Sequence, residues 1–140
     1  MSESENKAVI QRFIKDVLNL GRLETADEIV AENFIELDPL PGQKQGREGL
    51  KEIIVMLRSG FPDMNWVIEE MIASGEKVVT RFHWTGTHKG EFMGMPATGK
   101  SVKVKGVVID RIVGGRMTES RILMDDLGMM QQLGVIPAPA

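Results

Sequence analysis

GTHKGEFMGMPATGKS, residues 86–101, is the stretch that decides the fold of this chain. Its last eight residues, Gly94–Ser101, match the pattern Gly-x-x-x-x-Gly-Lys-Ser of a phosphate-binding loop. Such a loop needs a helix directly after it, because the amides of the helix N-terminus face the phosphate. Here SVKVKGVV follows at 101–108, where β-branched and polar residues alternate as in a strand. We therefore interpret the stretch as a glycine-rich connection between two β-strands and expect no nucleotide binding.

Four segments around this connection are predicted to be β-strands. They are rich in β-branched and aromatic residues or alternate between apolar and polar side chains. They span residues 66–72, 77–85, 101–113 and 116–124. Gly114 and Gly115 have the composition of a two-residue hairpin turn, which needs positive φ at both positions. The second half of the chain therefore predicts an antiparallel meander.

About the first sixty residues are predicted to be mostly helical. Ser2 and Glu5 have the spacing of a capping box, and Gly21 has the position of a C-cap glycine. Between them, apolar residues recur at helical spacing: Val9, Ile10, Phe13, Ile14, Val17 and Leu18. Further helices are expected at about 25–31 and 47–59 and, near the C-terminus, at 126–133. A short extended piece at 34–37 precedes a loop with two prolines.

Helices followed by antiparallel strands predict an α+β fold, with helices covering one face of a bent sheet. The segment 101–113 is apolar on both of its faces. One face carries Val102, Val104, Val108 and Ile112. The other face carries Val107 and Ile109, although the uncovered side of such a sheet should be polar. We therefore expect a homodimer that forms through the Val107 and Ile109 face.

Composition and charge exclude several classes of function. The net charge of −3 provides no basic surface, so nucleic-acid binding is not expected. The chain has no cysteine and 2 histidines, so we expect no metal site and no cofactor. No apolar run approaches the length of a membrane span, and no signal-peptide pattern is present. The expected location is the cytoplasm, with no membrane partner.

Four motifs follow one another along the chain: FPD at 61–63, GTHKGEFMGMPATGK at 86–100, RIVGGRMTES at 111–120, and D-x-x-G-x-x-x-Q-L-G at 125–134. Together they resemble the SnoaL-like proteins, which are polyketide cyclases and predicted ester cyclases of the nuclear transport factor 2-like superfamily. The resemblance covers nearly the whole chain. It implies one domain over residues 1–140 with an ordered core of about 4–134. The implied fold is a cone-shaped α+β barrel, in which N-terminal helices pack on a bent antiparallel sheet around an apolar pocket.

The resemblance implies a polyketide cyclase-like or ester cyclase-like protein that acts on a small apolar carbonyl or ester compound. In the cyclases, an aspartate of the last strand is the general acid/base, and a histidine of the preceding strand assists it. Ile122 and Val108 occupy these positions here, and two further polar positions of the family fall near Leu18 and Ile53. Since isoleucine exchanges no proton, a non-catalytic module for hydrophobic-ligand binding or dimerisation stays open as the alternative.

Seven residues are expected to line the pocket: Leu18, Phe34, Ile53, Leu57, Val108, Ile122 and Met124. Four ionisable residues are candidates for catalysis: Asp125, His83, His88 and Arg81. Each has a structural interpretation as well. Asp125 can cap the terminal helix, and His88 can anchor the loop that follows it. Arg81 and His83 share one strand face, where they can pair with an acidic residue of a neighbouring strand: Asp110, Glu119 or Asp125.

Overall fold

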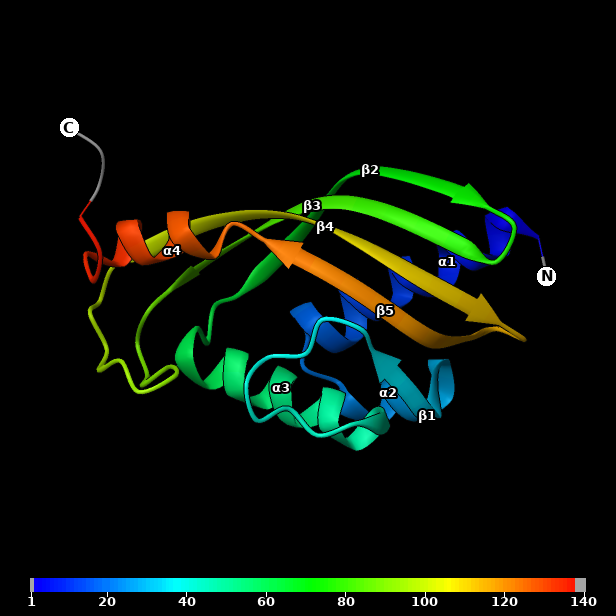
Figure 1. Ribbon diagram of the computed structural model, residues 1–140, viewed down its shortest axis with the longest axis horizontal. Helices are drawn as coiled ribbons and strands as arrows, with labels where there is room; N and C mark the ends of the chain where they lie inside the picture. Colours follow the sequence, from blue (N-terminus) through cyan, green and yellow to red (C-terminus); the bar gives the residue numbers. More distant parts are fainter. Residues whose placement is uncertain (1, 138–140) are drawn as a thin grey trace.

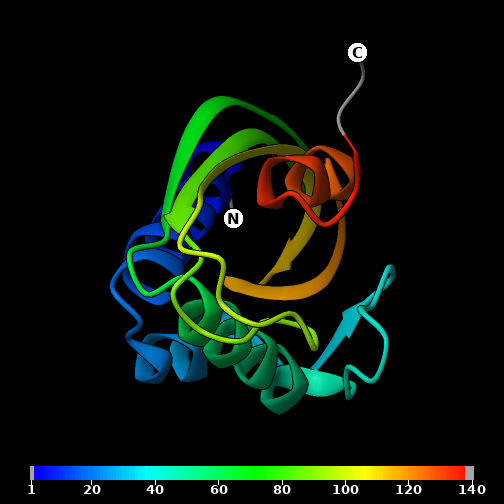
Figure 2. The ribbon, with the colours of Figure 1, turned by 90° about the vertical axis from the view of Figure 1, so that its left-hand side faces the viewer.

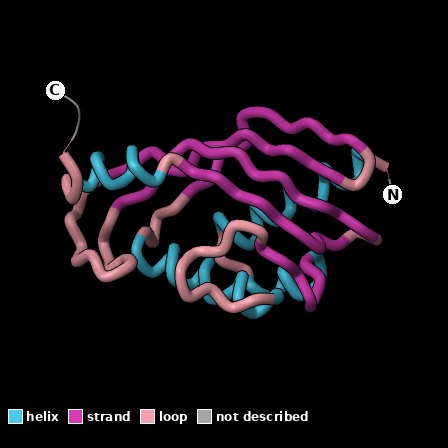
Figure 3. Tube along the Cα trace, in the orientation of Figure 1, coloured by secondary structure: helices cyan, strands magenta, loops and turns pink. Residues whose placement is uncertain are grey.

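The computed structural model describes residues 2–137 and has the predicted α+β architecture (Figure 1). In chain order the elements are α1 (Glu3–Arg12), the π-helical segment η1 (Phe13–Asn19), α2 (Leu23–Ile29), β1 (Val30–Glu36), α3 (Gly46–Gly60), β2 (Asn65–Ser74), β3 (Lys77–Thr87), β4 (Ser101–Val113), β5 (Arg116–Met124) and α4 (Asp126–Leu133). The strands form one layer and most of the helices form a second layer beneath it (Figure 3). Each predicted helix and strand is present within a few residues of its predicted bounds.

The sheet has five strands in the order β1-β5-β4-β3-β2. Strands β2 to β5 form the predicted antiparallel meander, and its last hairpin turns at Gly114 and Gly115 with φ of 58° and 79°. The sequence prediction of a purely antiparallel sheet was incomplete, because β1 pairs in parallel with β5 at the edge. This strand begins directly where α2 ends, without a glycine or proline between them, so only its end at 34–37 was visible in the sequence.

The sheet bends around the helices, as the end-on view in Figure 2 shows. Two register shifts have the form of β-bulges, which increase the twist and curvature of a strand. One leaves Glu69 of β2 without a partner on β3, and the other leaves Thr118 of β5 without a partner on β4. The predicted inner face of β4 is buried: Val102, Val104, Val108 and Ile112 are each at most 9% exposed. The concave face of the sheet and the helices therefore enclose the core.

The first helix begins with the predicted capping box, in which Ser2 and Glu5 bond each other's backbone amides. It continues as the π-helical segment η1, which the sequence did not predict. Four of its residues are buried: Phe13, Ile14, Val17 and Leu18. π-helical segments are rare and are frequent at functional sites. Gly21 follows with φ of 70° and ends the helix as predicted.

The glycine-rich stretch is the connection between β3 and β4, and Ser101 opens β4 rather than a helix. This confirms that the phosphate-loop pattern lacks its structural context. Backbone bonds His88 N to Lys100 O and Gly99 N to His88 O, both 2.9 Å, close the connection at its base. The FPD motif supports it from below: Asp63 accepts hydrogen bonds of 2.7 Å from both the amide and the hydroxyl of Thr87. The FPD motif and the glycine-rich connection are therefore in direct contact.

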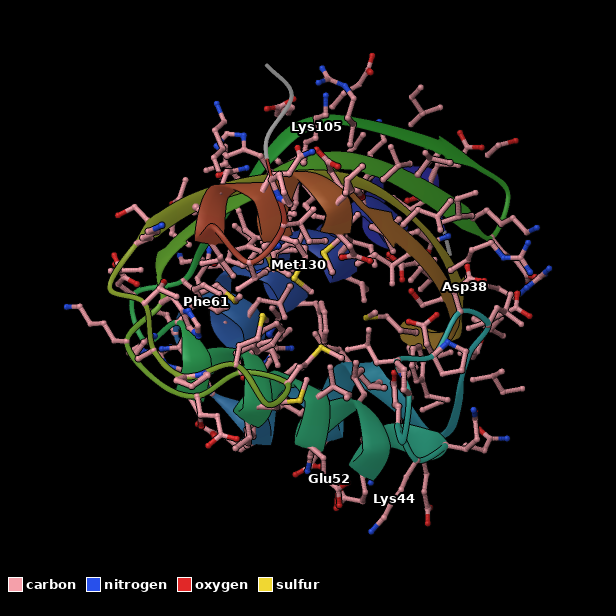
Figure 4. All side chains as sticks on the ribbon, turned by 60° about the vertical axis from the view of Figure 1, so that its left-hand side comes forward. Asp38, Lys44, Glu52, Phe61, Lys105 and Met130 are labelled. Atoms are coloured by element: carbon pink, nitrogen blue, oxygen red, sulfur yellow. The ribbon has the colours of Figure 1, made fainter. Side chains whose placement is uncertain are left out.

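The outer face of the sheet carries the second set of apolar residues. Val107 is 41% exposed, Ile109 is 38% exposed and Leu123, the cross-strand partner of Val107, is 69% exposed. Lys105 also points away from the helices on this side (Figure 4). No helix within residues 2–137 is long and apolar enough to cross a membrane.

Candidate active site

A cavity of about 370 Å³ lies between the concave face of the sheet and the helices. Residues from η1, β1, α3, β4 and β5 line it, and the proline-containing loop after β1 closes one side. Its wall includes all seven side chains that the sequence analysis placed in a pocket: Leu18, Phe34, Ile53, Leu57, Val108, Ile122 and Met124. A mostly apolar cavity of this size suits a small-molecule ligand.

Three polar residues form one row across the floor of this cavity. Asp110 on β4 is the cross-strand partner of Ser120 on β5, and Ser120 is in turn the partner of Glu36 on β1. All three line the cavity and are buried, with exposed fractions of 3%, 5% and 8%. We refer to Asp110, Ser120 and Glu36 as the polar row. The parallel strand β1 completes it, because β1 brings Glu36 beside Ser120.

Asp110 is the most perturbed carboxyl group of the cavity. Burial raises its pKa from the usual value of 3.8 to about 7. A hydrogen bond with the Ser120 side chain opposes this rise, and the nearby negative charge of Glu36 adds to it. One carboxyl oxygen of Asp110, Oδ1, has no hydrogen-bond partner among the described residues. A carboxyl group in this state can both take up and release a proton near neutral pH.

Glu36 is held in place at the end of β1. The backbone amide of Asp38 donates a hydrogen bond of 3.1 Å to Glu36 Oε2, and the amide of Leu37 donates one of 2.8 Å to the Ser120 carbonyl. Burial raises the pKa of Glu36 and the negative charge of Asp38 adds to the rise, whereas the backbone amides of Asp38 and Leu37 near its carboxyl group and the positive charge of Arg121 oppose it. Burial therefore raises the pKa of both carboxyl groups of the polar row.

The mouth of the cavity is also acidic. Asp38, labelled in Figure 4, lies where the loop after β1 approaches β5, and its Oδ2 is 3.6 Å from Arg121 Nε. Asp126 at the start of α4 lines the opposite side, and burial raises the pKa of its carboxyl group. By contrast, Lys44 and Glu52 project from the outer side of the α3 region and take no part in the cavity (Figure 4).

The polar row lies one step along the strands from the positions to which the family resemblance pointed. Val108 and Ile122 are cross-strand partners, and Asp110 and Ser120 are the next inward-facing pair on the same two strands. The sequence analysis considered Asp110 only as an ion-pair partner. Its signal was present, because Asp110 is the one charged residue at alternate positions between Val102 and Ile112.

Arg81 and His83 lie on the outer face of the sheet, away from the cavity. They share Glu69 of β2: Arg81 Nη1 pairs with Glu69 Oε2, and His83 Nδ1 is 2.6 Å from Glu69 Oε1. The predicted ion-pair partners Asp110, Glu119 and Asp125 were wrong. Asp110 is buried on the opposite face of the sheet, and Glu119 bonds Arg111 instead. Glu69, which the register shift in β2 leaves without a cross-strand partner, bonds both side chains. A catalytic role for Arg81 and His83 stays a prediction.

His88 and Asp125 both have the structural contacts that the sequence suggested. His88 is fully buried, stacks on Phe61 with 5.3 Å between ring centroids, and bonds Thr98 through Nδ1. It therefore anchors the glycine-rich connection. Asp125 caps α4, with its Oδ1 accepting a 2.9 Å bond from the Gly128 amide. Neither residue is among the described residues that line the cavity, and their catalytic roles also stay predictions.

Metal binding has little geometric basis in residues 2–137. No group of three histidine, aspartate or glutamate side chains there is arranged to hold a metal ion. The polar groups of the described cavity wall are four carboxyl groups, one hydroxyl, one side-chain amide and the indole N–H of Trp66.

Known proteins share the sequence pattern and the fold of this chain. The model of the SnoaL-like polyketide cyclase family matches residues 8–133. The chain belongs to this family. Its similarity to other SnoaL-like proteins extends over most of its length. The aklanonic acid methyl ester cyclase of Streptomyces peucetius is 26% identical over 129 residues, which cover 90% of this chain and 88% of the relative. The nogalonic acid methyl ester cyclase of Streptomyces nogalater is 27% identical over 118 residues, or 83% and 88% of the two chains.

Solved structures agree with the predicted fold of the SnoaL-like family. A protein from Acidithiobacillus ferrooxidans assigned to the polyketide cyclases is 33% identical and superposes with a TM-score of 0.84, over 96% of this chain and 99% of that one. TsrD from Streptomyces laurentii has the same fold at 24% identity, with a TM-score of 0.88 over 97% and 99% of the two chains. The cone-shaped α+β barrel expected from the sequence is thereby confirmed.

Proposed function

We propose that this SnoaL-like protein binds a small apolar carbonyl or ester compound in the cavity and exchanges a proton with it through Asp110. The observation that carries the proposal is a buried carboxyl group with a pKa of about 7 on the wall of a mostly apolar cavity. General acid/base catalysis is most efficient when the pKa of the catalytic group lies near the working pH. The two relatives named as methyl ester cyclases support a ring closure as the reaction type.

The reaction that fits these groups is an intramolecular aldol closure. The Asp110 carboxylate takes a proton from the carbon beside a carbonyl group, and the resulting enolate carbon attacks a second carbonyl of the same molecule. A carbon–carbon bond forms, and the protonated Asp110 returns its proton to the new alkoxide. Once Asp110 has taken up the proton, the single hydroxyl proton of Ser120 can turn from Asp110 to the oxygen on which negative charge develops. The carboxyl group ends the cycle as it began, and the apolar walls exclude water from the enolate.

A non-catalytic binding function is the second candidate. It is favoured by Val108 and Ile122, which are apolar where the cyclases have their acid/base pair, and by the apolar residues that surround them. Such a protein would shelter a hydrophobic molecule in the cavity without changing it. The two candidates differ in one measurable property, the exchange of protons between protein and ligand.

Hydrogen–deuterium exchange at a ketone tests the two candidates directly. The protein is incubated with 2-tetralone in deuterated water, and loss of the α-proton signal is followed by NMR. We expect acceleration over buffer, and the Asp110→Asn variant should lose it by a factor on the order of 100. Glu91→Gln, on the exposed connection between β3 and β4, is the matched control that should retain the wild-type rate.

Three results would change the assignment. Binding of 2-tetralone without faster exchange would favour the non-catalytic function. Loss of exchange in Asp125→Asn but not in Asp110→Asn would return the catalytic role to Asp125. If 2-tetralone is neither bound nor exchanged, the cavity loses support as the functional site.

The predicted homodimer and cytoplasmic location are also part of this proposal. The exposed apolar residues Val107, Ile109 and Leu123 on the outer sheet face support a second copy as the partner. The wild type should then sediment as a dimer at high micromolar concentration, and the Leu123→Glu variant should sediment as a monomer. A wild-type protein that is monomeric under these conditions would contradict the dimer.

A further inference from the structure

The ionisable residues that line the cavity within residues 2–137 are all acidic. Four carboxyl groups line it: Glu36, Asp38, Asp110 and Asp126. No lysine, arginine or histidine is among the described residues on its wall. Arg121 lies 3.6 Å from Asp38 and offsets that one charge at the mouth. The inner end of the cavity, formed by the polar row, therefore has two carboxyl groups and, among the described residues, no positive group beside them.

Asp110 and Glu36 are the two carboxyl groups of this inner end, and both are more than nine-tenths buried. Neither forms an ion pair within residues 2–137. Asp110 Oδ1 also lacks any hydrogen-bond donor there, although it lines the cavity. Buried acceptors without partners are costly, and buried charges in folded proteins are normally paired. This unpaired oxygen points to a ligand that supplies both a donor and a positive charge.

We infer that the ligand of this cavity is an apolar molecule bearing a basic amine, whose ammonium group binds the polar row at Asp110 and Glu36. An ammonium group has three N–H donors and one positive charge, so it can satisfy Asp110, Glu36 and the Ser120 hydroxyl together. The aliphatic and aromatic wall holds the rest of the molecule. The inference rests on the proposed function in one respect, namely that the cavity is the substrate site.

A bound ammonium group also fits the proposed reaction. Positive charge beside the polar row favours the ionised forms of both carboxyl groups and so opposes the effect of burial. Asp110 and Glu36 would then both bind the amine as carboxylates, and the remaining lone pairs of the Asp110 carboxylate would accept the substrate proton. An anionic ligand has the opposite effect. It would place a third negative charge against two buried carboxyl groups, so a free acid should bind far more weakly than a neutral or cationic molecule.

Three probes with one apolar cage separate charge from shape. They are 1-aminoadamantane, 1-adamantanol and adamantane-1-carboxylate, which are cationic, neutral and anionic at pH 8. Isothermal titration calorimetry of the full-length protein should give tightest binding for the amine, roughly 10- to 100-fold tighter than for the alcohol, as expected for hydrogen bonds to a charged group. The carboxylate should bind weakest of the three.

Variants assign this preference to the polar row. Asp110→Asn and Glu36→Gln should each reduce the amine affinity by about tenfold or more, while the affinity for the alcohol stays within about threefold of wild type. Glu69→Gln on the outer sheet face is the matched control for Glu36→Gln and should leave all three affinities unchanged. Thermal unfolding of each variant verifies that it is folded.

Several outcomes would overturn the inference. Equal affinities for the three probes would refute the charge preference and leave the apolar cavity of the proposed function intact. An amine preference that persists in both variants would place the ammonium group elsewhere and refute the inference as well. Tightest binding of the carboxylate would do the same. Absence of binding by all three probes would count against the amine inference and against the cavity as a ligand site.

Discussion

Replacing Asp110 by asparagine should stabilise the protein most strongly at alkaline pH, although it removes the proposed catalytic group. Asparagine keeps the size and hydrogen-bonding capacity of the side chain but carries no charge. In the native protein, burial raises the pKa of Asp110 to about 7, whereas the unfolded chain returns it to the usual 3.8. The native state therefore binds this proton more tightly than the unfolded state does.

The sign and size of the effect follow from this difference in pKa. Between pH 4 and pH 7 the unfolded carboxyl group has lost its proton and the native group has not, so native stability falls as the pH rises. The slope is about 1.4 kcal/mol for each pH unit. From pH 5 to pH 7 the wild type should lose roughly 2.3 kcal/mol of unfolding free energy through Asp110 alone, and about 0.4 kcal/mol more above pH 7 as the native group finishes losing its proton. The asparagine variant is free of this loss.

Urea denaturation at pH 5 and at pH 8.5 measures the difference. The stability advantage of Asp110→Asn should grow by about 3 kcal/mol between the two, which for a chain of this size corresponds to a change in relative Tm on the order of 10 °C. Groups remote from the cavity titrate alike in both proteins, so their contributions cancel in the comparison. Exposed Glu91→Gln is the control, and its offset from wild type should be the same at both values of pH.

An advantage of Asp110→Asn that does not change between pH 5 and pH 8.5 would refute the reasoning. It would mean that Asp110 titrates in the native protein much as it does in the unfolded chain. The proposed acid/base role would then lose its physical basis, because the carboxyl group would be ionised throughout the neutral range. An advantage that grows toward acidic pH would show that a positive charge absent from the described cavity wall stabilises the carboxylate.

Three further predictions concern single side chains. Ser120→Ala removes the hydrogen bond that lowers the pKa of Asp110, so the pH midpoint of catalysed exchange should move upward in a pH–rate profile. A downward shift would contradict the arrangement of the polar row. His88→Ala should lower the unfolding free energy by about 2–4 kcal/mol, because it leaves a void beside Phe61 and removes the hydrogen bond to Thr98. A loss below about 1 kcal/mol in urea titration would contradict the anchoring role. Asp125→Ala should cost about 1 kcal/mol through loss of the α4 cap, and Asp125→Asn, which keeps an acceptor for the Gly128 amide, should recover most of that loss in the same measurement.

The local structure of this protein was largely readable from its sequence. The capping box at Ser2, the glycine at position 21 and the hairpin at Gly114 and Gly115 act through neighbouring residues, so they need no distant contact to take effect. The alternation along 101–113 likewise separated the buried face of β4 from its exposed face, because the period of a strand is a property of its own backbone. The motifs that resembled the SnoaL-like family pointed correctly to the fold.

The candidate site was decided only by the tertiary structure. Glu36, Ser120 and Asp110 belong to three strands, and their alignment depends on the parallel pairing of β1 with β5, which no local pattern encodes. Asp110 has a pKa of about 7 because the folded chain removes water from it, and burial is a property of the whole fold. Arg81 and His83 likewise bond Glu69, which the register shift in β2 leaves unpaired, rather than any of the predicted acidic residues. The sequence determined the elements and their faces, whereas long-range register and burial decided which side chains meet and how they ionise.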